Sequence, residues 1–183
     1  MPKLLFVLAE RGFSDDELRA LRSRLVSRGV DVRTAGKNPK KVIGTVRLQL
    51  VPDVPIHKSC LHGVDGVVVL GGHGARKYLW GDRDVMQLVE GAALEHKILV
   101  GVGLGAVLPA QATLLVGKDA TCAPEEDAIY ELRKHNARYV QVPVVEADNG
   151  VITASGPEAA EELVHLIMDK LSRRRVAEAH PRL

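Results

Sequence analysis

Apolar and polar positions along the chain follow two periods, one typical of buried strands and one typical of amphipathic helices. Continuous apolar runs of strand length occupy residues 3–9, 65–70 and 98–102, as in parallel strands that are covered on both faces. Between the first run and a strand expected over 30–35, leucines recur at helical spacing, and Ser14 is placed to cap the start of that helix. This alternation predicts an α/β fold with a doubly wound, mainly parallel sheet and helices on both faces.

The later elements continue the alternation, apart from an irregular stretch over 36–64 that we expect to leave the main sheet. Within that stretch, residues 46–50 alternate like a short exposed strand. Helices are expected over 76–94 with a break near Gly81, and over 106–115, 125–134 and 160–171; strands are expected over 142–146 and 151–154, around an Asp-Asn-Gly turn. We expect one domain over residues 1–172 and a basic, flexible tail over 173–183.

Composition narrows the classes of partner. The 183 residues carry 25 Lys and Arg against 23 Asp and Glu, a formal net charge of +2, which gives no reason to expect a nucleic-acid or anionic-membrane partner. No apolar run approaches the ~20 residues that span a bilayer. Two cysteines, Cys60 and Cys122, are too few for a disulfide framework. We therefore expect a cytoplasmic protein without a membrane partner.

Doubly wound sheets bind ligands at the carboxyl ends of their strands, and four motifs lie at such places. Gly12-Phe13-Ser14-Asp15-Asp16-Glu17 is similar to a Gly-Phe-Glu-Asp-x-Glu stretch, and Leu70-Gly71-Gly72-His73-Gly74-Ala75 is similar to a Pro-Gly-Gly-x-Gly turn. Two later segments, 117–124 and 153–157, follow in the right order and spacing. Together the four segments resemble the DJ-1/PfpI (ThiJ) superfamily over about residues 3–171.

The resemblance implies a flavodoxin-like fold of the class I glutamine amidotransferase-like kind, a homo-oligomer that is most simply a dimer, and a catalytic cysteine at a strand-to-helix elbow. In this chain the elbow falls on residues 101–105, and Gly103 stands where the cysteine is expected. Leu104 and Ala123 stand where branches of the superfamily place a histidine. Covalent catalysis needs a nucleophilic side chain, whereas glycine relieves the strain of an elbow. We therefore expect the fold to be kept and the cysteine chemistry to be lost.

The residual pocket is expected to consist of Glu17, Gly72, His73, Gly103, Leu104 and Gly105. By the resemblance, Glu17 matches the carboxylate that hydrogen-bonds the cysteine, but it also fits the third helical position of a capping box that begins at Ser14. His73 fits a pocket residue or a loop hydrogen-bonder. Backbone N–H groups near Gly72 and Leu104 are expected to form an oxyanion-type nest.

Two other kinds of site have weaker support. Residues 101–106 fit the dinucleotide fingerprint G-x-G-x-x-A, yet they do not lie in the first strand–helix turn, and no acidic residue ends the following strand. Glu17, His73 and His62 are metal-ligand types, but no short-spaced pair of ligands supports a metal site. We therefore expect neither a cofactor nor a bound metal.

These observations favour a pseudoenzyme that binds a small molecule in the degenerate pocket or a partner protein through its surface. The alternative is an enzyme of the hydrolase, deglycase or glyoxalase-like class, comparable to PfpI-type intracellular proteases and amidases. Such an enzyme would act through Cys122, which follows the elbow helix, or through Glu17 and water. A nucleophilic role for Cys122 requires a lowered thiol pKa.

Overall fold

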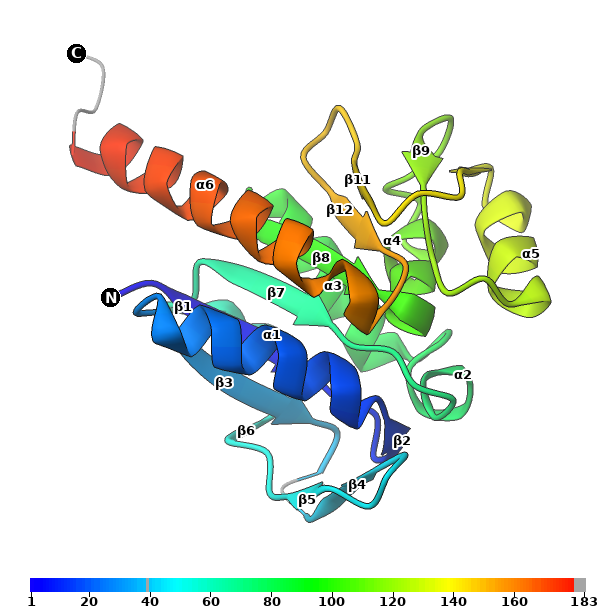
Figure 1. Cartoon of the computed structure of the whole chain (residues 1–183), viewed down its shortest axis with the longest axis horizontal. Helices are drawn as coiled ribbons and strands as arrows, with labels where there is room; N and C mark the ends of the chain where they lie inside the picture. Colours follow the sequence, from blue (N-terminus) through cyan, green and yellow to red (C-terminus); the bar gives the residue numbers. More distant parts are fainter. Residues whose placement is uncertain (39, 180–183) are drawn as a thin grey trace.

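A seven-stranded sheet forms the centre of the computed structural model, which describes residues 1–38 and 40–179 (Figure 1). Every neighbouring pair of strands is parallel except the pair at one edge, β11 and β12. The predicted flavodoxin-like, doubly wound α/β fold is therefore confirmed. In spatial order the strands are β11 (Val144–Glu146), β12 (Ile152–Ala154), β8 (Ile98–Val102), β7 (Gly66–Val69), β1 (Lys3–Val7), β3 (Asp31–Gly36) and β6 (Val54–Pro55).

Helices cover both faces of the sheet. On one face, α1 (Asp15–Ser27) packs beside α6 (Ala160–Ala179), and on the other lie α3 (Arg83–Leu94) and α4 (Val107–Gln111) (Figure 1). The leucines that predict α1 from their spacing are buried against the sheet. No helix in residues 1–38 and 40–179 is both long and apolar enough to cross a membrane.

Most helices end where the backbone adopts a positive φ, and the apolar pattern predicts only some of these ends. The expected break near Gly81 is confirmed, because α2 (Ala75–Tyr78) and α3 are separate and Gly81 has a φ of +66°. The helix expected over 106–115 is shorter: it follows the 3₁₀ turn η2 (Gly103–Ala106) and ends at Gln111, where Thr113 adopts a φ of +61°. The helix expected over 125–134 is confirmed as α5 (Glu126–Lys134).

The C-terminal boundary needs a correction. Helix α6 continues through Ala179, so residues 173–179 of the expected flexible tail are helical. The apolar periodicity that predicts the helix stops at Leu171. The residues after it are mostly good helix formers, so the helix continues although it no longer packs an apolar face against the sheet. Residues 180–183 lie outside the described part of the chain.

The irregular stretch leaves the main sheet as expected, except at β6. Its strands β4 (Val42–Gly44) and β5 (Gln49–Leu50) join β2 (Arg11–Phe13) in a three-stranded satellite sheet, while β9 (Asp119–Ala120) and β10 (Arg138–Tyr139) form a pair elsewhere. The exposed strand expected over 46–50 is reduced to β5, because Arg47 has a φ of +67° and turns the chain. The remaining 3₁₀ turns are η1 (Lys58–Leu61) and η3 (Pro157–Ala159).

Asp15, at the start of α1, anchors the turn of the satellite sheet. Its buried carboxylate accepts hydrogen bonds from the Thr45 hydroxyl at 3.0 Å, Val46 N–H at 2.9 Å and Leu48 N–H at 2.8 Å. Burial acts to raise the pKa of Asp15, but these hydrogen bonds outweigh it and hold the pKa below its usual value. The N-terminus of α1 is thus fixed to the satellite sheet by an ionised side chain.

Candidate functional site

A cleft of about 390 Å³ lies at the carboxyl edge of the sheet, where the chain leaves β1, β7, β8 and β12. The strand order reverses here, because β1 lies between β3 and β7, and such reversal points are where doubly wound sheets bind ligands. The cleft is lined by Ser14, Glu17, Gly72, His73, Leu104, Ala123, Pro124, Glu125, Ser155, Gly156, Pro157 and Glu158.

Gly103 keeps the backbone conformation of an elbow but has no side chain to present. It follows β8 directly and has a φ of +57°, in the left-handed region that glycine tolerates best. A Cβ built on Gly103 would lie 2.4 Å from Glu17 Oε1. The Glu17 carboxyl therefore occupies the space in front of Gly103, and Gly103 is buried behind it.

Glu17 has a capped backbone and a side chain that points into the cleft. The Ser14 hydroxyl accepts a hydrogen bond from Glu17 N–H at 3.2 Å, which is one half of the expected capping box. The reciprocal half is missing, because Glu17 Oε2 accepts from Gly71 N–H at 2.6 Å, while Ser14 N–H donates to Gly71 O at 3.0 Å. Of the two interpretations of Glu17, the structure supports the pocket carboxyl.

The environment of Glu17 favours its neutral form. The residue is 4% exposed, and burial raises its pKa to about 8, although the hydrogen bond from Gly71 N–H acts to lower it. The negative charges of Glu158 and Asp16 raise the pKa further. Near neutral pH, Glu17 is therefore mainly a carboxylic acid, which has a proton to donate in a hydrogen bond or to a reacting group.

The other predicted pocket residues divide between the cleft wall and its support. Gly72, His73 and Leu104 line the cleft, with His73 exposed at its rim. Gly105 does not line it, because Gly105 packs so closely on β7 that a Cβ would lie 2.3 Å from Val69 O. Backbone amides near Gly72 and Leu104 are expected from the sequence to form a nest for an oxyanion. The amide next to them, Gly71 N–H, already donates its hydrogen bond to Glu17.

Two carboxylates of the cleft were not predicted from the sequence. Glu158 accepts a hydrogen bond from the Ser155 hydroxyl at 2.5 Å. Ser155 lies within the segment 153–157 that carries the last family-like motif, and Glu158 follows it directly. Glu125 pairs with Arg76, which also donates to Asp127 at 2.8 Å. With Glu17 they give the cleft three carboxyl groups, which favours polar ligands that donate hydrogen bonds or carry positive charge.

Neither cysteine is placed as an activated nucleophile. Cys122 is fully buried, and burial, with added repulsion from Asp127 and Glu125, raises its thiol pKa to about 12. Cys60 is half-buried in η1, where its thiol donates to Pro55 O at 2.7 Å. The raised pKa keeps the Cys122 thiol protonated at neutral pH, so Cys122 is a poor nucleophile.

The candidate metal ligands are not brought together. Glu17 and His73 line the cleft, whereas His62 is an exposed residue just after η1 and does not. Among residues 1–38 and 40–179 there is no cluster of three or more His, Cys, Asp and Glu side chains that could hold a metal ion.

Comparison with known proteins gives one family. The model of the DJ-1/PfpI family matches residues 2–170. An uncharacterized protein of Methanocaldococcus jannaschii, MJ0967, is 31% identical over 158 residues, which cover 86% of this chain and 77% of that protein.

Two solved structures share the fold. A ThiJ/PfpI domain protein from Brachyspira murdochii superposes with a TM-score of 0.84 at 24% identity, covering 93% of this chain and 96% of that chain. A mutant of the DJ-1 superfamily protein STM1931 from Salmonella typhimurium superposes with a TM-score of 0.82 at 22% identity, covering 98% and 97%.

The raised pKa of Glu17 predicts a pH-dependent stability. Between its ordinary pKa of 4.5 and about 8 the folded state keeps a proton that the unfolded state has lost, so the free energy of unfolding falls as the pH rises, by up to about 1.4 kcal/mol per pH unit. Glu17→Gln is nearly isosteric and does not titrate. Urea unfolding between pH 5 and pH 9 should show the wild type losing stability relative to Glu17→Gln; parallel curves would show that Glu17 is not buried as described.

The contact between Gly103 and Glu17 predicts the effect of a methyl group at position 103. Gly103→Ala is expected to lose about 1–2 kcal/mol of stability from its left-handed backbone and about 1–3 kcal/mol more by displacing Glu17 from Gly71.

Gly117→Ala is the matched control, because Gly117 has a similar φ of +70° with nothing within 4 Å of a built Cβ. Denaturant unfolding of both variants, repeated in a Glu17→Ala background, measures the second contribution. Equal losses at the two glycines would contradict the contact.

Proposed function

The chain belongs to the DJ-1/PfpI family, and from this premise we propose that it is a non-catalytic member that binds a small molecule in the cleft beside Glu17. The observation that carries the proposal is the elbow itself. Gly103 supplies no nucleophile, and the Glu17 carboxyl lies in the space where a side chain of residue 103 would project. Without that side chain the elbow presents no group that can form a covalent intermediate, while the cleft keeps a binding surface.

The proposed ligand is a small polar molecule. A cleft of about 390 Å³ is within the range of small-molecule sites. The neutral Glu17 carboxyl offers a hydrogen-bond donor, while Glu125 and Glu158 offer acceptors at the rim. We propose a ligand with an acceptor group for Glu17 and hydroxyl or amine donors for the two rim carboxylates.

The second candidate function is hydrolysis in which Glu17 moves the proton of an attacking water. One observation favours it: a buried carboxyl with a pKa near 8 lies in a cleft at the expected position, and general acid–base catalysts have such pKa values. The first proposal is preferred because no Lys or Arg is among the residues that line the cleft, so no fixed positive charge would stabilise a developing oxyanion.

Trp80 provides the test of binding against turnover. It is the chain's single tryptophan, and its indole N–H donates at 2.9 Å to the carbonyl of Leu104 in the cleft wall. We expect small hydroxylated amines and amino acids, screened singly, to include compounds that shift Trp80 fluorescence in a saturable way and are recovered unchanged after long incubation. Glu17→Ala should weaken this binding about tenfold, the equivalent of one lost hydrogen bond to the ligand.

Cys60→Ala, far from the cleft, is the control and should bind as the wild type does. Consumption of any bound compound that stops in Glu17→Gln would replace the binding proposal with the hydrolase. Absence of saturable binding across the screen would reject the cleft as a site for this ligand class.

The buried thiol predicts a pattern of chemical labelling. With its pKa raised to about 12, Cys122 should react with iodoacetamide at pH 8 only when the protein unfolds, whereas half-buried Cys60 should react in the folded protein. Peptide mapping by mass spectrometry distinguishes the two sites, and Cys60→Ala supplies a folded protein without the faster thiol. Rapid labelling of Cys122 in the folded protein would instead support the alternative of an enzyme that acts through Cys122.

A further inference from the structure

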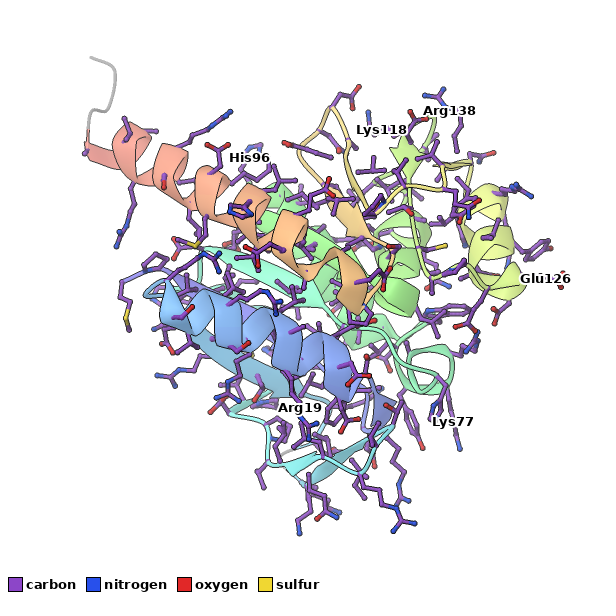
Figure 2. All side chains as sticks on the ribbon, in the orientation of Figure 1. Arg19, Lys77, His96, Lys118, Glu126 and Arg138 are labelled. Carbon is purple, nitrogen blue, oxygen red and sulfur yellow. The ribbon has the colours of Figure 1, made fainter. Side chains whose placement is uncertain are left out.

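A second cavity, of about 580 Å³, lies at the opposite edge of the sheet from the cleft. The amino ends of β8 and β12 form its floor, and it is bounded by the end of α3, the β11–β12 turn and the C-terminal half of α6, which extends past the sheet (Figure 1). Figure 2 shows His96, just beyond α3, beside α6. None of the residues that line this second cavity lines the cleft beside Glu17.

Cationic side chains outnumber carboxylates in the lining of this cavity. The two carboxylates of the lining, Glu146 and Asp169, are both paired. Lys170 Nζ lies 2.5 Å from Glu146 Oε1, and Arg173 Nη2 lies 2.8 Å from Asp169 Oδ2. Lys97 is paired with a carboxylate outside the lining, Glu95, at 3.4 Å, and Arg174 has no carboxylate partner among the described residues. The cavity therefore has an excess of positive charge, although the whole chain is nearly neutral.

The two surplus cations are held in place by backbone carbonyl groups. Lys97 Nζ donates to Val64 O at 2.8 Å, and Arg174 Nη1 donates to the carbonyl of His96. A carbonyl fixes the position of a cation without cancelling its charge, so Arg174 keeps its full charge, whereas Glu95 partly offsets that of Lys97. Arg174 Nε is buried and has no hydrogen-bond partner among the described residues, so the guanidinium still has donor capacity.

Glycine and apolar residues complete the cavity. Gly150, in the β11–β12 turn, has a φ of +84°, and a Cβ built there would lie 3.7 Å from Lys170 Nζ, so the amine lies directly across from the turn. Ile98, Val151 and Leu166 give the cavity an apolar wall. Preoriented cations beside an apolar wall are the features that bind an anionic group attached to an organic body.

We propose that this cavity binds a small organic phosphate, with its phosphate group between Lys97, Lys170 and Arg174 and its organic part against Ile98, Val151 and Leu166. Structural roles account for part of this arrangement: Arg174 caps the C-terminal end of α3 at the His96 carbonyl, and Lys170 is paired with Glu146. Neither role explains the buried Arg174 Nε, which has no hydrogen-bond partner among the described residues. The site is independent of the function proposed for the cleft.

Phenyl phosphate tests the proposal by isothermal titration at pH 7.5 and constant ionic strength. We expect saturable binding to one site of the intact chain, weaker binding of inorganic phosphate, which lacks the organic body, and weaker binding of benzenesulfonate, which carries less charge. Arg174→Gln should weaken phenyl phosphate binding about tenfold, as for a lost charge-assisted hydrogen bond.

Arg175→Gln is the matched control, because it removes the same charge one residue along α6 and Arg175 lines a different cavity. It should bind as the wild type does, and so should Glu17→Gln. Equal weakening by Arg174→Gln and Arg175→Gln, or no saturable binding, would overturn the proposal; loss in Glu17→Gln would assign the phosphate to the cleft instead. If Arg174→Gln has a lower urea midpoint than Arg175→Gln and is therefore less stable, Lys170→Gln replaces it in the titration. Lys170→Gln should also weaken phenyl phosphate binding about tenfold.

Discussion

The hydrogen bond from Gly71 N–H to the Glu17 carboxyl is the interaction on which the arrangement of the cleft depends. It joins the first strand–helix crossover to the second, and the bond from Ser14 N–H to Gly71 O strengthens the same junction. The carboxyl fits there because residue 103 has no side chain. The burial of Glu17 and its preference for a proton are therefore two results of one local arrangement, which the missing side chain at residue 103 permits.

Two carboxyl groups in the first turn of α1 show how hydrogen bonds decide the ionisation of buried acids. Asp15 and Glu17 are both buried, but Asp15 accepts from two backbone amides and a hydroxyl, whereas Glu17 accepts from one amide. The pKa of Asp15 is lowered and that of Glu17 is raised. Hydrogen bonds to a buried carboxylate therefore act against burial: they prevail at Asp15, whereas at Glu17 burial and the negative charges of Glu158 and Asp16 prevail.

The sequence predicts the sheet well, because buried parallel strands are continuous apolar runs. The meeting of crossover turns at one edge indicates where the cleft lies, and the resemblance to the DJ-1/PfpI superfamily selects Glu17, Gly72, His73 and Leu104 within those turns. Other features have no local signature. The positive φ values at Arg47 and Thr113, which shorten an expected strand and an expected helix, occur at residue types that seldom adopt them. The choice of Glu17 between cap and pocket is a rotamer set by Gly71, which is 54 residues away in the sequence. Glu125 reaches the cleft only through the packing of loops.

The fit of Glu17 against Gly103 also constrains how the chain can change during evolution. A cysteine at residue 103 would meet Glu17 Oε1 at its first side-chain carbon, so it requires Glu17 to leave its hydrogen bond with Gly71 at the same time. Gly103→Cys alone is therefore not enough to place a thiol in the cleft; a second change that moves the Glu17 carboxyl has to accompany it.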